Sequence, residues 1–161
     1  MFMQKNIAVH IILGSKTDIP IAEKCKKILD DFGVSSEIRI ASAHRTPEYL
    51  KNIIKTSRAK IFIAIAGLSA ALAGVIASQT TRPVIGIPIS GKVNLDSILS
   101  TVQMPPGIPV AAVGLDNGEN AALLAIAILA LQNESLSKKL EEYRIKLQKR
   151  IEEDDKSILR E

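Results

Sequence analysis

The chain has 161 residues, of which 47% are hydrophobic and 24% are charged. This length and composition indicate one domain with a full core and exclude a disordered or low-complexity chain. A single cysteine, Cys25, and two histidines exclude a disulfide framework, a cysteine-based metal cluster and a histidine-rich metal site. The net charge is +4 and only 3% of residues are aromatic. This mild excess fits an anionic small molecule better than nucleic acid.

The first apolar run, residues 7–13, is short and is followed by no cleavage pattern of a signal peptide. Residues 61–81 contain no charge, which raises the possibility of a membrane span. Gly67, however, divides this run into a β-branched half and a half rich in small residues. That pattern is typical of a buried strand, a turn and a buried helix. We therefore expect a cytoplasmic protein without a membrane span.

Short aliphatic runs predict strands at residues 7–13, 36–40, 61–66, 84–87 and 110–113. Between the first two, apolar residues recur at helical spacing and Gly33 follows as a stop. Thr46 and Pro47 are suited to the cap and first position of the next helix. Residues 121–131 are apolar all round, which predicts a fully buried helix. Alternating strands and helices indicate parallel strands with right-handed crossovers, and so a three-layer α/β sandwich.

The last 28 residues, 134–161, form a charged tail with as many acidic as basic side chains. Its apolar residues recur every three or four positions, at Leu136, Leu140, Tyr143, Leu147 and Ile151. Such a narrow stripe fits either a solvated helix lying on its own domain or a helix packed on a neighbouring subunit. We favour the subunit contact, and we expect a catalytic domain over residues 1–133 followed by this extension.

The loops after the strands are the candidate binding segments, because ligands of open parallel sheets bind at the carboxyl ends of the strands. The first loop contains Gly14, Ser15, Thr17 and Asp18. Its glycine, hydroxyls and following helix suit a phosphate, and the Asp18 carboxylate could accept hydrogen bonds from ribose hydroxyls. Equally, Ser15 and Asp18 could only cap the helix. The spacing matches neither a P-loop nor a dinucleotide-binding motif.

The second loop places His44 beside Arg45, directly before a predicted helix. Arg45 offers a planar fork of donors to a phosphate, and His44 can exchange protons near neutral pH. The alternative is a surface histidine with a structural arginine. His10 lies within the first predicted strand, so we interpret it as a core histidine with satisfied hydrogen bonds.

The third loop, residues 67–74, is uncharged and rich in small residues, including Gly67 and Ser69. Small residues let a ligand approach backbone N–H groups closely. Packing between buried elements explains the same composition about as well.

Five motifs, in this order, resemble the catalytic subunit of phosphoribosylaminoimidazole carboxylase, over nearly the whole chain. They are Gly14-Ser15-Lys16-Thr17-Asp18, Ser42-Ala43-His44-Arg45-Thr46-Pro47, Ala66-Gly67, Val102-Gln103-Met104-Pro105 and Asn120-Ala121-Ala122-Leu123-Leu124. The class I form of that family is N5-carboxyaminoimidazole ribonucleotide mutase, an enzyme of de novo purine biosynthesis. It moves a carboxylate from the exocyclic nitrogen to ring carbon C4, giving 4-carboxyaminoimidazole ribonucleotide.

The resemblance implies a flavodoxin-like sheet of order 2-1-3-4-5 and a homo-octamer that uses no metal and no organic cofactor. It assigns the phosphate of a phosphoribosyl substrate to Ser15, Ser42 and Arg45. It assigns binding of the ribose to Asp18 and proton transfer to His44. With Arg45 on the phosphate, Gly67, Ser69 and nearby N–H groups are left for the substrate's carboxylate.

Different loops of this chain resemble different classes of the family. Class I members usually have a histidine and a proline where this chain has Ala71 and Ala73, and the third loop resembles class II, a carboxylase that uses carbon dioxide directly. Arg45-Thr46-Pro47 and Gln103-Met104-Pro105 resemble class I. We favour the class I mutase. The alternatives are a class II carboxylase (a lyase) and a non-catalytic phosphoribosyl-binding protein.

Overall fold

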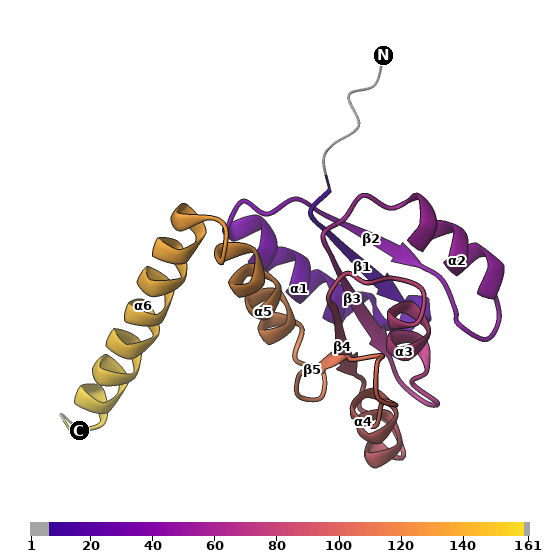
Figure 1. Ribbon diagram of the computed structural model, residues 1–161. Helices are drawn as coiled ribbons and strands as arrows, with labels where there is room; N and C mark the ends of the chain where they lie inside the picture. Colours follow the sequence, from indigo (N-terminus) through magenta and orange to yellow (C-terminus); the bar gives the residue numbers. More distant parts are fainter. Residues whose placement is uncertain (1–6, 160–161) are drawn as a thin grey trace. The chain divides into compact units, whose positions relative to one another are not determined.

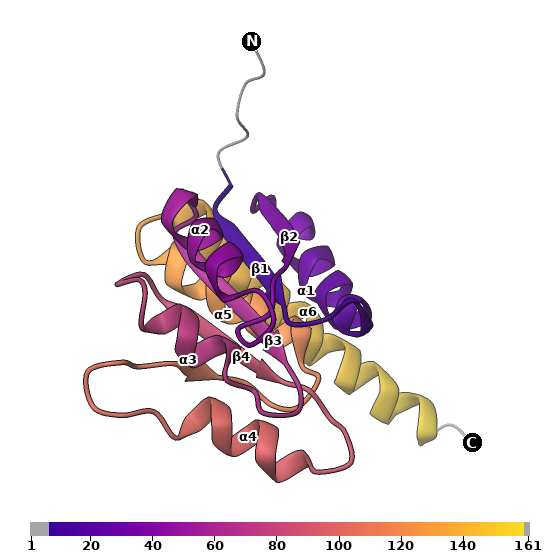
Figure 2. The same ribbon diagram turned by 90° about the vertical axis from the view of Figure 1, so that its right-hand side faces the viewer.

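The computed structural model describes residues 7–159 and contains one five-stranded parallel sheet. Its strands lie in the order β2-β1-β3-β4-β5, which confirms the predicted topology (Figures 1 and 2). The sequence pattern predicted all five strands to within two residues at each end. Their bounds are β1 Val9–Leu13, β2 Ser36–Ile40, β3 Ile61–Ala66, β4 Val84–Pro88 and β5 Ala111–Ala112.

The helices alternate with the strands as predicted. A short 3-10 helix, η1 (Lys16–Asp18), leads into α1 (Ile19–Asp31), and Gly33 follows with a φ of 76°, a conformation that favours glycine. The remaining helices are α2 (Pro47–Thr56), α3 (Leu72–Ala77), α4 (Asn94–Val102), α5 (Gly118–Ala130) and α6 (Glu134–Ile158).

Successive side chains of each strand enter opposite layers of the core. Ile12, Phe62 and Ala64 pack with α2 and α3 on one face of the sheet. Ile11 and Ile63 are registered with each other and fall on the opposite face. On that side Gly118, at the start of α5, is so close to α1 that an added Cβ would lie 2.5 Å from the Ile21 carbonyl oxygen. Because all five strands are parallel, their carboxyl ends lie at one edge of the sheet, between the two helical layers.

Two expectations about the helices differ from the structure. Thr46 precedes α2 but its hydroxyl makes no capping bond. It bonds instead to the backbone of Ser42, accepting from the N–H at 2.9 Å and donating to the carbonyl at 3.2 Å. The apolar helix α5 is not fully buried, since Leu131 just beyond it is 85% exposed and the side chains of Leu123 and Leu124 are half-buried. A helix in an outer layer contacts its own chain through one face only.

His10 is buried as expected, but only one of its ring nitrogens is engaged. Its Nε2 lies 3.5 Å from a Glu37 carboxylate oxygen, and its ring meets Phe62 edge to face. Nδ1 has no hydrogen-bond partner within the described residues. Burial lowers the pKa of His10, against an opposing contribution from Glu37. His10 is thus a core histidine that favours the neutral form.

The chain divides into two compact units, residues 1–125 and 126–161. The first holds the sheet. The second holds α6, which begins with the Asn133 side chain accepting the Leu136 N–H at 3.1 Å. The predicted division after residue 133 stays a prediction. Within residues 7–159, no helix has the length and apolarity that crossing a membrane requires.

Candidate functional site

A cavity of about 470 Å³ opens at the carboxyl ends of β1, β2 and β3. It is lined by all three loops that the sequence singled out. All seven predicted site residues line it, namely Ser15, Asp18, Ser42, His44, Arg45, Gly67 and Ser69. Its size is in the range of pockets that hold small ligands. Segments far apart in the sequence therefore meet at one site.

The first loop presents hydroxyl groups and one carboxylate. Ser15 precedes η1, and its Oγ accepts the Thr17 N–H at 3.4 Å and lies 3.0 Å from the Thr17 hydroxyl oxygen. Asp18 occupies the cap position of α1 without making a capping bond, and its carboxylate accepts the Thr17 hydroxyl at 3.1 Å. The capping explanation therefore holds in part for Ser15 and not for Asp18, whose side chain lines the cavity.

Burial raises the pKa of the Asp18 carboxyl above its usual value, and the nearby Asp116 carboxylate raises it further. The hydroxyl of Thr17 acts in the opposite direction. Asp116 follows β5 with a φ of 55°, and its carboxylate accepts the N–H of Ser90 at 2.9 Å and also the Ser90 hydroxyl. The loops after β4 and β5 thus place a second carboxylate near Asp18.

The second loop carries the only histidine of the cavity lining. His44 is exposed, and no hydrogen bond or ion pair within the described part of the chain restrains its imidazole. The loop backbone that carries it is held by Thr46 and by the Ser42 hydroxyl, which accepts the Arg45 N–H at 3.2 Å. A fixed backbone with an unrestrained imidazole leaves both ring nitrogens available to a ligand.

Arg45 joins the first loop to the second. One of its terminal nitrogens donates to the Gly14 carbonyl at 2.8 Å, and its Nε donates to the Ser42 hydroxyl at 3.4 Å. The guanidinium has five N–H donors, so this bridge leaves donors for an anion. Arg45 is therefore both a structural link and the cation of the cavity lining.

The third loop has a backbone that sequence reasoning did not foresee. Ser69 has a φ of 51°, in the left-handed region that L-residues rarely adopt. Its N–H, expected to be available to a substrate carboxylate, donates instead to Asp96 Oδ2 at 2.8 Å. Its carbonyl accepts the Ala71 N–H at 2.5 Å. The side chain of Ser69 lines the cavity while its amide is occupied.

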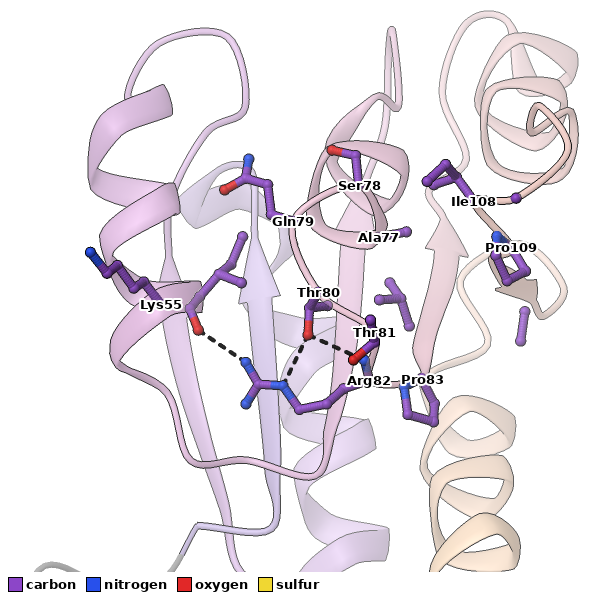
Figure 3. Close-up of a pocket in the computed structure, with 14 residues that line it drawn as sticks. Lys55, Ala77, Ser78, Gln79, Thr80, Thr81, Arg82, Pro83, Ile108 and Pro109 are labelled. Carbon is purple, nitrogen blue, oxygen red and sulfur yellow. Dashed lines mark hydrogen bonds between the residues drawn. The ribbon is translucent and has the colours of Figure 1, made fainter.

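A larger cavity, of about 1060 Å³, lies beside the amino ends of β4 and β5 (Figure 3). Two cations, Lys55 and Arg82, line it, and Arg82 is occupied because its guanidinium donates to the carbonyls of Ile54, Ser57 and Ala59 at 2.7–3.0 Å. Figure 3 shows this side chain turned toward Thr80, which accepts from its Nε at 3.0 Å. No histidine, cysteine or carboxylate lines the larger cavity, so the smaller one is the candidate site.

Sequence reasoning missed two carboxylates that support the site, Asp96 and Asp116. Neither belongs to a motif, and each acts on a loop more than twenty residues earlier in the chain. The one sequence signal for Asp96 is its position as an acidic residue in the first turn of a helix. Among residues 7–159, no cluster of three histidine, cysteine, aspartate or glutamate side chains is arranged to hold a metal ion.

Comparison with known proteins places the chain among relatives of similar length. N5-carboxyaminoimidazole ribonucleotide mutase from Methanocaldococcus jannaschii is 58% identical over 151 residues, covering 93% of this chain and 96% of that protein. The protein of the same name from Pyrococcus abyssi is 49% identical over 141 residues, covering 84% and 81%.

A solved structure has the same fold. The crystal structure of Treponema denticola PurE superposes with a TM-score of 0.85 at 34% identity, covering 92% of this chain and 96% of that one. The family model described as AIR carboxylase matches residues 8–150. The chain belongs to the AIR carboxylase family.

Proposed function

We propose that this chain is an N5-carboxyaminoimidazole ribonucleotide mutase of purine biosynthesis, with its active site in the cavity of about 470 Å³. The observation that carries the proposal is the meeting of His44, Arg45 and the first and third loops around that one cavity. Relatives of 58% and 49% identity bear the name of this activity.

The substrate's phosphate binds where the first two loops meet. Arg45 lies between the Gly14 carbonyl and the Ser42 hydroxyl, so its remaining donors and the hydroxyls of Ser15 and Ser42 can surround an anion. Asp18 accepts hydrogen bonds from the ribose. Burial, which raises the pKa of Asp18, partly shields its carboxyl group from water, and such shielding strengthens hydrogen bonds to it.

His44 performs both proton transfers. The imidazolium first gives its proton to the exocyclic nitrogen, and the N–C bond breaks to leave aminoimidazole ribonucleotide and carbon dioxide. Ring carbon C4 then attacks the carbon dioxide, and neutral His44 takes the C4 proton. The proton balance closes over one turnover, and no metal or organic cofactor enters the scheme.

The third loop encloses the carbon dioxide. A Cβ at Gly67 would meet only the Ile89 side chain, at 3.6 Å, so packing does not require glycine there. Ala66 and the buried Leu72 line the cavity beside Gly67, and their apolar surface limits the escape of a small neutral molecule, whereas Leu68 on the rim is 81% exposed. Gly67 thus lets the reacting carboxylate approach the backbone closely.

The second candidate is a class II carboxylase that joins carbon dioxide to aminoimidazole ribonucleotide directly, and the specific observation in its favour is the third loop. Ala71 stands where class I members usually have histidine, and its methyl group donates no hydrogen bond. Losing one neutral donor costs about 0.5–1.5 kcal/mol, which weakens an enzyme without abolishing it. We therefore retain the mutase.

The test gives purified protein each substrate separately and follows ultraviolet absorbance. N5-carboxyaminoimidazole ribonucleotide should be converted without ATP or added bicarbonate. If only aminoimidazole ribonucleotide with excess carbon dioxide yields product, the carboxylase replaces the mutase. Binding of both without turnover of either would identify a non-catalytic phosphoribosyl-binding protein.

We also propose a cytoplasmic homo-octamer in which residues 134–161 form subunit contacts. Support comes from the single chain, in which Leu147 and Ile151 of α6 are 45% and 68% exposed. Removal of residues 134–161 should lower the particle mass measured by light scattering. An unchanged mass would contradict the role of the extension, and a monomeric full-length protein would contradict the octamer.

A further inference from the structure

The third loop is held by a residue outside the cavity lining. Asp96 lies in the first turn of α4, and its Oδ2 accepts the N–H of Ser69 at 2.8 Å. Ser69 and Leu68 line the cavity, whereas Asp96 does not. Asp96 therefore determines which way the Leu68–Ser69 peptide faces.

The conformation that this bond holds is an uncommon one. Ser69 and Asp116 are the two described non-glycine residues with a positive φ, and such a backbone persists only where its surroundings impose it. Ser69 is fixed on both sides, by Asp96 at its N–H and by the Ala71 N–H at its carbonyl. Only Asp96 reaches it from another element.

The first turn of α4, which carries Asp96, is itself held by hydrogen bonds. Ser97, which is 1% exposed, donates its hydroxyl to the Ile89 carbonyl at 3.0 Å, and the Asn94 side chain accepts the Gly91 N–H at 2.8 Å. Ile89 in turn donates its N–H to the Ala66 carbonyl at 3.1 Å. The start of α4 is thereby tied to the end of β3, where the third loop begins.

We propose that Asp96 is a positioning residue for the carboxylate-transfer end of the active site. By holding Ser69 in its left-handed conformation, it keeps the third loop in place along the cavity wall, where the loop limits the escape of carbon dioxide between the two proton transfers. This inference rests on the proposed mutase function. It predicts a defect in retaining carbon dioxide rather than in binding the phosphoribosyl group, which the first two loops bind.

The competing explanation is that Asp96 only stabilises α4, since a carboxylate in the first turn of a helix interacts favourably with the helix dipole. Two variants separate these roles. Asp96→Ala removes both the acceptor and the charge, whereas Asp96→Asn removes the charge and keeps an oxygen that can accept the Ser69 N–H. Ser100→Ala, on the same helix, is the matched control, because within residues 7–159 the Ser100 hydroxyl donates to the Asp96 backbone carbonyl and makes no bond to the third loop.

The activity experiment supplies N5-carboxyaminoimidazole ribonucleotide and measures both products, the C4 carboxylate and the aminoimidazole ribonucleotide left when carbon dioxide escapes. For Asp96→Ala we expect kcat to fall about tenfold, KM to change less than about threefold, and the escaping fraction to rise several-fold. Asp96→Asn should stay within about threefold of wild type in all three, and Ser100→Ala should match wild type.

The second experiment needs no turnover. Hydrogen exchange of the full-length protein, followed by mass spectrometry over residues 67–72, should be about tenfold faster at the Ser69 amide in Asp96→Ala and unchanged in Ser100→Ala. Unchanged exchange in Asp96→Ala overturns the proposal. So does an unchanged escaping fraction, or an Asp96→Asn variant as impaired as Asp96→Ala. If the wild type converts neither substrate, the proposed function fails, and exchange alone decides whether Asp96 holds the loop.

Discussion

The two ends of the candidate site are held in different ways. The first and second loops are polar and are joined by a side chain of the site itself, since Arg45 bonds to both Gly14 and Ser42. The third loop has no charged residue and is held from outside, by Asp96 on α4. The polar end is therefore held by a hydrogen-bonding residue of the site itself, whereas the third loop is held by a residue of a helix outside the site.

This difference follows from what each end has to do in the proposed reaction. Binding a phosphate requires hydroxyls and a cation, and such side chains can also bond to one another. Retaining carbon dioxide requires an apolar wall, and small or apolar side chains offer no hydrogen bonds with which to fix a loop. Substitutions at each end should therefore change different quantities, substrate binding at the polar end and retention of carbon dioxide at the third loop.

His44 is the proposed acid and base of the reaction, and its removal should have the largest effect. His44→Asn keeps a polar side chain of similar size but cannot transfer protons near neutral pH. Turnover should fall at least about a hundredfold, with substrate affinity nearly unchanged. Steady-state rates and calorimetric binding check this, with the exposed neighbour Glu48→Gln as control. A variant with near-normal turnover would end the assignment.

Arg45→Lys breaks the polar end without removing its charge. One ammonium group cannot bond to Gly14, to Ser42 and to a phosphate in the geometry of the guanidinium fork. We expect KM to rise roughly tenfold while kcat changes less, and the escape of carbon dioxide to stay at the wild-type fraction. Arg58→Lys, an exposed arginine at the end of α2, should behave as wild type. A rise in escaping carbon dioxide would show that the two ends are not separate.

Ala71→His returns to the third loop the side chain that class I relatives usually have. Because the missing interaction is one neutral hydrogen bond, the rate should change by about tenfold or less. Ala71→Leu controls for side-chain volume in the same assay. A change of a hundredfold or more would mean that the third loop takes part in proton transfer, contrary to the division of roles.

His10 differs from His44 in lying in the core. Substituting His10 should therefore change the stability of the protein and not its turnover. Burial lowers its pKa below the ordinary value of 6.5, so the unfolded chain binds a proton at a higher pH than the folded one. The stability linked to neutral His10 is thus complete above about pH 6.5 and is lost as the pH falls toward the lowered pKa.

Between about pH 7 and pH 5 the Tm of the wild type should therefore fall a few degrees more than that of His10→Leu. Turnover at neutral pH should be alike in the two proteins. Parallel Tm curves would contradict the linkage, and a catalytic defect in His10→Leu would contradict the assignment of the proton transfers to His44 alone.

The sequence predicted the strands and the three loops because both leave local signals. A buried parallel strand is a short aliphatic run, and a binding loop collects polar or small residues directly after it. Those signals were sufficient to place His44, Arg45 and Gly67 around one cavity. The topology also followed, since alternating strands and helices allow few arrangements.

Interactions between distant segments left no such signal. The bond from Ser69 to Asp96 spans 27 residues, and that from Ser90 to Asp116 spans 26. The positive φ of Ser69 was not foreseeable, because serine adopts that region only where its surroundings impose it, whereas aspartate tolerates the region without requiring it. The unpartnered Nδ1 of His10 likewise depends on the packing around it.

In the proposed reaction, carbon dioxide released at one atom is captured at another without leaving the site. It is tested by giving the enzyme substrate labelled with 13C in the carboxylate, in unlabelled bicarbonate, and measuring the label in the product by mass spectrometry. Nearly all of the product should keep the label. Product carrying carbon from the bicarbonate pool would contradict it.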